Sequence, residues 1–208
     1  MIQAQVKVEG LESFEGFVGR LRARLEDLQE LMEEIARYGE SSTVRRIKEG
    51  VPPPNAPLTR AWKKGNDTPL RDTGRLMASI THRAGRDFAA WGTNVPYARI
   101  QQLGGRVKPK KAKKLAIPAG WHTRRLMRRY GETPEKCLEG LRRAGWRIWF
   151  TDGAIMGQPP RKRGRAKPVV LFIRKKSVTI PARPFLKIDE QDKREILEIV
   201  REWIRGRR

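Results

Sequence analysis

A row of apolar residues near the N-terminus is the feature that most restricts how this chain folds. Between Leu11 and Ile35, apolar side chains recur every three or four positions, at Leu11, Phe14, Val18, Leu21, Leu25, Leu28, Met32 and Ile35. This spacing places them along one side of an α-helix. We expect a long helix that packs this side on the rest of the protein or on a neighbouring subunit. Gly and Ser at residues 39–42 predict an interruption, after which a further turn or two reaches Lys48.

The strongest strand signal is the continuous apolar run over residues 169–174, VVLFIR, which is typical of a buried central strand. Residues 2–8 alternate apolar and polar side chains, as a half-buried strand does. Residues 80–83 and 88–91 read as a hairpin with its turn at residues 85–87. Further short strands are predicted over residues 114–118, 146–151 and 177–180.

Shorter helices are predicted between these strands from apolar spacing and end signals. Those with the clearest ends are residues 97–103, stopped by Gly104, and residues 134–144, capped by Thr133. The others are residues 70–80, 121–130 and an amphipathic C-terminal helix over 189–205. Residues 50–58 contain three successive prolines and predict an extended loop, and residues 153–168 also read as a loop.

These elements predict an α+β fold, in which long N-terminal and C-terminal helices pack on a mostly antiparallel sheet. We expect residues 1–105 and 169–208 to form a single domain. Residues 106–168 are then a basic insertion or arm.

Positive charge is concentrated in two runs that contain no acidic residue, residues 106–129 and residues 161–176. The whole chain has 46 Lys and Arg against 23 Asp and Glu, a formal net charge of +23, whereas residues 1–50 hold 8 basic and 10 acidic side chains. Two readings remain open for the runs: solvated loops, or contact with nucleic acid phosphate or an acidic protein. The basic residues that we expect to face DNA or a partner are Lys110, Lys111, Lys113, Lys114, Arg161, Lys162, Arg163 and Arg165.

Composition argues against several classes of protein. One cysteine and two histidines leave no disulfide framework and make an all-protein zinc site improbable. No stretch is long and apolar enough for a membrane span or a signal peptide. Ser79, His82 and Asp87 are close in sequence, but hydrolytic triads are assembled in space rather than by such clustering. We expect a soluble protein made in a reducing compartment, with no enzymatic activity, metal or cofactor and with Cys137 as a buried thiol.

Four short motifs in a fixed order indicate the class of protein more specifically than the composition does. They are PLRDTGRLMASI at 69–80, WGTN at 91–94, YARIQQLG at 97–104 and IPARPFL at 180–186, preceded by Thr59, Trp62 and Lys63. This set resembles the phage virion morphogenesis family of Mu-like phages and prophages. It is also similar to the wider group of neck and tail-completion proteins of tailed phages.

The motif residues are suited to holding a fold or a subunit contact. Pro184 disfavours helix at Arg183, whose guanidinium can fork to a carboxylate or a backbone carbonyl, while Phe185 can fill an apolar hollow. The residues that we expect to make fold or subunit contacts are Leu70, Thr73, Gly74, Leu76, Ile80, Gly92, Tyr97, Ala98, Gly104, Pro181, Ala182, Arg183, Pro184 and Phe185.

The resemblance implies a non-enzymatic virion component, made in the host cytoplasm, that joins the neck to the tail or terminates the tail tube. Such proteins form closed rings, commonly hexamers. The implied partners are further copies of the chain, a connector protein on the portal side, the tail tube protein and DNA in the channel, with no membrane. The N-terminal helix, the arm and the C-terminal helix are the candidate ring contacts. The alternative is a basic nucleic-acid-binding protein, which the net charge alone would support.

Overall fold

The computed structural model describes residues 11–63, 67–160 and 166–206, and the chain divides into two compact units. Unit 1 comprises residues 1–45, 79–94 and 186–208, and unit 2 comprises residues 46–78 and 95–185. The predicted strand over residues 2–8 lies outside the described residues. The α+β class and the antiparallel sheets are confirmed.

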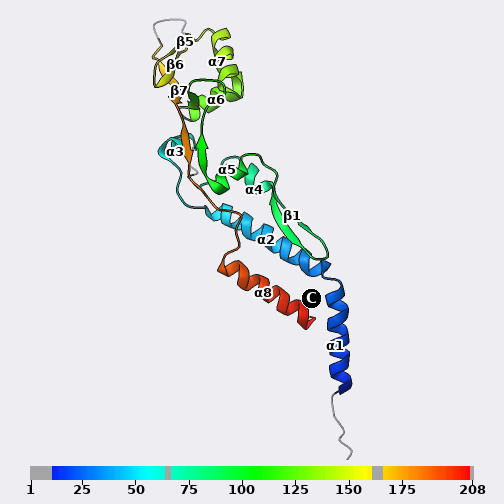
Figure 1. Cartoon of the computed structure of the whole chain (residues 1–208). Helices are drawn as coiled ribbons and strands as arrows, with labels where there is room; N and C mark the ends of the chain where they lie inside the picture. The colour runs from blue at the N-terminus through cyan, green and yellow to red at the C-terminus, as the bar shows by residue number, and fades with distance from the viewer. Residues whose placement is uncertain (1–10, 64–66, 161–165, 207–208) are drawn as a thin grey trace, which may run out of the picture. The chain divides into compact units, whose positions relative to one another are not determined.

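Unit 1 is built from helices and one hairpin. Its elements are α1 (Leu11–Glu26), most of α2 (Gln29–Glu49), the antiparallel strands β1 (Ile80–Ala84) and β2 (Ala89–Thr93), and α8 (Glu190–Arg205) (Figure 1). The buried Asp192 of α8 accepts hydrogen bonds from Tyr38 Oη, at 3.1 Å, and from Ser42 Oγ, both on α2. Asp189 and Asp192 also form a capping box, which explains why α8 begins where the sequence predicts.

The interruption of the N-terminal helix was predicted at the wrong place. The structure breaks the helix at Asp27 and Leu28, where the Asp27 carboxylate accepts a hydrogen bond from Gln29 N at 3.0 Å, and α2 continues through residues 39–42. Gly39 stands inside α2 because the Trp91 ring lies against it: a Cβ there would come within 2.3 Å of the ring. Ser42 bonds Asp192 and so does not compete for the helix backbone.

Unit 2 contains a four-stranded antiparallel sheet in the order β4-β7-β6-β5. Its strands are β4 (Leu115–Pro118), β5 (Arg147–Phe150), β6 (Ala154–Gln158) and β7 (Val169–Lys175), with α6 (Trp121–Tyr130) and α7 (Pro134–Arg143) beside them (Figure 1). The core between helices and sheet consists of Cys137, Leu138, Leu141, Ile155, Leu171 and Phe172. The predictions of β7 as a central strand and of Cys137 as a buried thiol are confirmed, and burial raises the pKa of that thiol.

A separate basic arm is not shown for residues 106–168. This segment supplies three of the four strands of the sheet and both of its helices, so it is folded onto β7. Strand β6 was wrongly expected to be a loop. Gly157 belongs to this strand because it lies against Leu171, where a Cβ would come within 2.5 Å of a side-chain carbon. The predicted domain boundaries at residues 105 and 169 stay a prediction.

The rest of unit 2 is made of short elements. They are α3 (Pro57–Trp62), α4 (Arg75–Ala78), α5 (Ala98–Leu103), and the antiparallel pair β3 (Gly105–Val107) and β8 (Val178–Ile180). The helix predicted over residues 70–80 is limited to α4. Leu70 and Gly74 have φ angles of 62° and 84°, which a right-handed helix does not accommodate.

Candidate functional site

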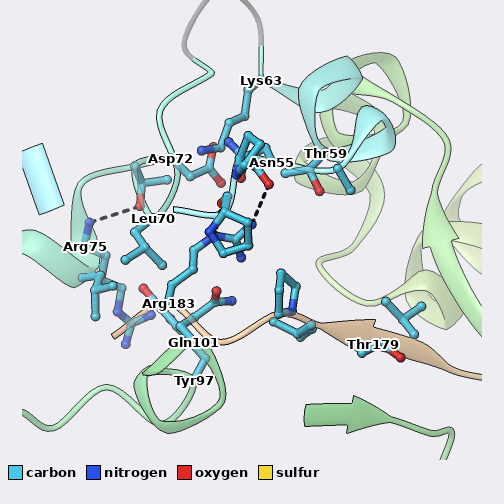
Figure 2. Close-up of a pocket in the computed structure, with 18 of the residues that line it drawn as sticks. Asn55, Thr59, Lys63, Leu70, Asp72, Arg75, Tyr97, Gln101, Thr179 and Arg183 are labelled. Carbon is cyan, nitrogen blue, oxygen red and sulfur yellow. Dashed lines mark hydrogen bonds between the residues drawn. The ribbon is translucent and has the colours of Figure 1, made fainter. Parts of the chain in front are cut away.

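Unit 2 encloses a hollow of about 770 Å³, lined by several segments that are distant in the sequence. The proline-rich loop, the start of α3, the turn before α4, α5, α6 and the end of β8 all contribute. Figure 2 shows ten of the lining residues labelled, namely Asn55, Thr59, Lys63, Leu70, Asp72, Arg75, Tyr97, Gln101, Thr179 and Arg183. Seven of the fourteen motif residues singled out in the sequence analysis therefore meet at one place.

Arg183 joins two walls of this hollow. Its Nε donates to Pro53 O at 2.8 Å and its Nη2 to Pro54 O at 3.0 Å, while its backbone N donates to Gln101 O at 2.8 Å. The residue is buried, and burial lowers the pKa of its guanidinium. The guanidinium therefore donates to two backbone carbonyls. From the sequence, either a backbone carbonyl or a carboxylate was expected as its partner.

The segment that carries Arg183 is held along its length. Phe185 is fully buried; its N donates to Gln102 Oε1 at 2.9 Å, and its carbonyl accepts from Arg46 Nη1 at 3.0 Å. Gly104, with φ 70°, lies so close that a Cβ would meet the backbone N of Ala182 at 2.6 Å. Residues 180–185 are thus clamped on α5, so the wall of the hollow is rigid.

The opposite wall holds an ion pair. Arg124 of α6 donates from Nη1 and Nη2 to the two Asp72 oxygens, at 3.2 Å and 2.5 Å, and this hydrogen bonding lowers the pKa of Asp72. Lys63 Nζ donates to Thr68 O at 2.6 Å, and desolvation lowers the pKa of the amine. These contacts hold the charged side chains of Asp72, Arg124 and Lys63 in defined positions, from which they can bind a partner.

The charge of the lining is positive. Four cations, Lys63, Arg75, Arg124 and Arg183, stand against one carboxylate, Asp72. The Arg75 side chain is exposed and has no hydrogen-bonding partner among the residues that the structure describes, and Tyr97, which also lines the hollow, is 42% exposed. The hollow is therefore suited to receiving a chain segment that brings apolar and acidic groups.

Comparison with known proteins assigns a family. A sequence profile of the phage virion morphogenesis family matches residues 10–137. The chain is also 36% identical over 118 residues to Mu-like prophage FluMu G protein 2 of Haemophilus influenzae, an alignment covering 55% of this chain and 79% of that protein. The chain belongs to the phage virion morphogenesis family. No solved structure matches it significantly.

Membership of the phage virion morphogenesis family makes the chain a virion-assembly protein and indicates a structural role. The matched range contains the motifs at 69–80, 91–94 and 97–104. The motif at 180–186 lies beyond it, so its place in the family pattern stays a prediction. In the described part of the chain no helix has the length and apolar character needed to cross a membrane.

Some predicted residues lie away from the hollow. Ile80 and Gly92 are on the hairpin of unit 1. Pro181, Arg183, Thr73, Gly74 and Leu76 line the hollow. The motif residues of unit 2 that do not line it are Ala98, Gly104, Ala182, Pro184 and Phe185. Lys110, Lys111 and Lys113 are exposed, and Lys114 pairs with Asp152, donating to its carbonyl at 2.8 Å. Arg161, Lys162, Arg163 and Arg165 lie outside the described residues.

Sequence reasoning missed several lining residues, among them Asn55, Gln101 and Arg124. Asn55, whose Nδ2 donates to Asp67 O at 2.6 Å, is an isolated amide in a proline-rich loop. Gln101 and Arg124 belong to helices whose inward-facing side could be predicted only from apolar spacing. Asn55 and Arg124 stand outside the four motifs, and Gln101 stands inside the one at 97–104 without having been expected to line a site. Only the folded chain brings the three together.

His82 of β1 contacts two carboxylates of α2. Its Nδ1 lies 2.5 Å from Glu40 Oε2 and its Nε2 lies 3.0 Å from Glu33 Oε1. Hydrogen bonds to the two carboxylates raise the pKa of the imidazole. The ring therefore ties β1 to α2.

Proposed function

We propose that this protein is a structural virion component that closes into a hexameric ring and joins the neck to the tail or terminates the tail tube. Family membership supports a role in assembly. The observation that carries the proposal is the gathering of half of the motif residues, from three of the four motifs, around one hollow. Their side chains are of types that bind and position other groups, and the hollow gives the subunit a concave surface that can receive a neighbouring copy.

A closed ring requires two unlike and complementary surfaces on each copy, because each subunit meets its two neighbours through different faces. We assign the hollow of unit 2 to one of these surfaces. Tyr97 and Arg75 stand exposed at its edge, and Tyr and Arg are enriched among the residues that dominate interface energies.

The complementary surface is assigned to exposed apolar side chains of unit 1. They are Phe17, Val18 and Leu25 of α1 and Leu197 and Ile204 of α8, all at least 40% exposed. Exposed apolar groups on neighbouring turns of a helix are typical of protein contact sites. Glutamates such as Glu15 and Glu198 accompany them, which matches the positive lining of the hollow.

The test is the mass of the assembly, measured by light scattering after size exclusion in 0.3 M salt. The wild-type protein should have six times the chain mass of 24.0 kDa. Replacing Arg75 by Glu together with Tyr97 by Ala should give a monomer with an unchanged melting temperature. The matched control is Arg99→Glu, an exposed cation of α5 that does not line the hollow, and it should keep the wild-type mass.

Two results would contradict the proposal at different points. A wild-type protein that remains a monomer at every concentration would remove the ring. A double variant that keeps the wild-type mass would leave the ring in place and remove the hollow from its contacts.

A further inference from the structure

The charge of the chain is divided unequally between its two units. Unit 1 holds 15 Lys and Arg against 16 Asp and Glu, so its charges nearly cancel. Unit 2 holds 31 Lys and Arg against 7 Asp and Glu. The whole positive excess of the protein therefore belongs to unit 2, and a folded body with this charge attracts polyanions.

Among the helices of unit 2, α6 carries the most cations and has no acidic residue. Its inner side, made of Thr123, Leu126, Met127 and Tyr130, is buried or half-buried, and the last three pack on the core around Cys137. Its exposed residues are Trp121, His122, Arg125, Arg128 and Arg129. At 100° per residue they fall within one outward arc. This α6 face contains three arginines and no acidic residue.

The three arginines of the α6 face form no ion pair within the described part of the chain, although the charge of Arg128 helps to lower the pKa of Asp72. No carboxylate lies within ion-pair distance of Arg125, Arg128 or Arg129 among the residues that the structure describes. Arg129 lies over the Tyr130 ring, 5.4 Å from its centre, and the nearby Asp72 is taken by Arg124.

Helix α7, which packs against α6 and the same sheet, differs from α6 because its exposed cations stand among acidic residues. Its exposed cations Lys136, Arg142 and Arg143 are accompanied by Glu135 and Glu139, and Arg143 forms an ion pair with Glu139. Of these two helices, α6 is therefore the one on which unpaired positive charge accumulates. A solvated helix needs no such accumulation, since mixed charge serves solubility equally well.

We infer that the α6 face binds the phosphate backbone of double-stranded DNA through Arg125, Arg128 and Arg129. Four residues of helix advance about 6 Å, and a duplex carries one negative charge per about 1.7 Å of its axis, so all three guanidinium groups can reach phosphates together. The planar guanidinium matches phosphate oxygens in pairs. Phosphate contacts carry no base information, so binding is independent of sequence. The inference does not depend on the ring.

The experiment measures the salt dependence of binding. A fluorescein-labelled 20-bp duplex of mixed sequence is titrated with the full chain at several NaCl concentrations, and anisotropy gives the affinity. The test variant replaces Arg125, Arg128 and Arg129 by Gln. The matched control replaces Lys136, Arg142 and Arg147 by Gln, which removes the same charge from exposed positions of unit 2.

Three lost phosphate contacts should reduce the slope of log K against log salt by about 2.7, and should weaken binding at 0.1 M salt roughly 500-fold. The control should change the slope by less than about 1. If the triple variant fails to fold, each single Arg→Gln change should reduce the slope by about 0.9.

Equal losses of affinity and of salt slope in the two triple variants would overturn the inference. They would show that the duplex is attracted by the net charge of the protein and not bound by the α6 face. A wild-type protein that binds polyglutamate but not the duplex would also overturn it, in favour of an acidic protein partner. Light scattering on the same samples reports the ring separately, so failure of one proposal is distinguishable from failure of the other.

Discussion

Replacing Phe185 by Ala tests the clamped segment behind the hollow. The side chain is fully buried, whereas its backbone hydrogen bonds to Gln102 and Arg46 survive the change. The loss is therefore that of the aromatic ring alone. A buried aromatic side chain removes about 150–250 Å² from water, which corresponds to about 4–6 kcal/mol at ~25 cal/mol per Å². Since Ala keeps part of this area, we expect a loss of about 3–5 kcal/mol in the free energy of unfolding.

Urea unfolding followed by circular dichroism measures this loss. With an m-value of about 2 kcal/mol/M, the midpoint should fall by about 2 M. Phe185→Leu is the control and should lose less than about 1.5 kcal/mol, because it fills most of the same volume. A urea midpoint for Phe185→Ala within about 0.3 M of the wild-type midpoint would show that the phenyl ring of Phe185 does not stabilise unit 2.

His82 and Gly104 provide two further predictions, one in each unit. The raised pKa of His82 stabilises the fold fully below the ordinary value of 6.5, and the lowered pKa of Glu33 does so above 4.5. The urea midpoint of the wild type should therefore exceed that of His82→Gln most between these pH values, and the difference should shrink as pH rises through the imidazole pKa; a difference independent of pH would contradict the pairing. Gly104→Ala places a Cβ at φ 70° against Ala182 N and should lose at least about 2 kcal/mol in thermal unfolding. Gly153→Ala, where a Cβ meets nothing, should change little, and equal losses in both would remove the argument from close approach.

Elements with strong local signals were predictable from the sequence. Strand β7 follows from its unbroken apolar run, α7 from Thr133, whose hydroxyl accepts from Lys136 N, and α5 from the glycine that ends it. In each case a few adjacent residues determine the conformation. The same holds for the hairpin β1–β2, whose alternation and turn lie within one short stretch.

Glycines that serve tertiary packing were misread for a physical reason. Gly39 and Gly157 carry the same local signal as glycines in turns, but each stands inside a regular element because a Trp91 or a Leu171 side chain occupies the space of its Cβ. That requirement comes from a residue distant in sequence. It therefore becomes visible only in the folded chain.

The candidate site was predictable in its parts and not as a whole. The motifs supplied Lys63, Arg75, Tyr97 and Arg183, and their types indicated binding rather than catalysis. Their convergence on one hollow depends on Arg183 reaching the carbonyls of Pro53 and Pro54, a contact across about 130 residues. No periodicity or spacing encodes such a contact.

The account depends most on the place of this protein in the finished particle. Cryo-electron microscopy of purified virions that carry it measures that place directly. We expect a closed ring of six copies at the junction of neck and tail, with exposed apolar side chains of one copy against the Tyr97 edge of the hollow in the next. Finished particles that lack the protein, or that hold it as isolated copies whose hollows face solvent, would contradict the account.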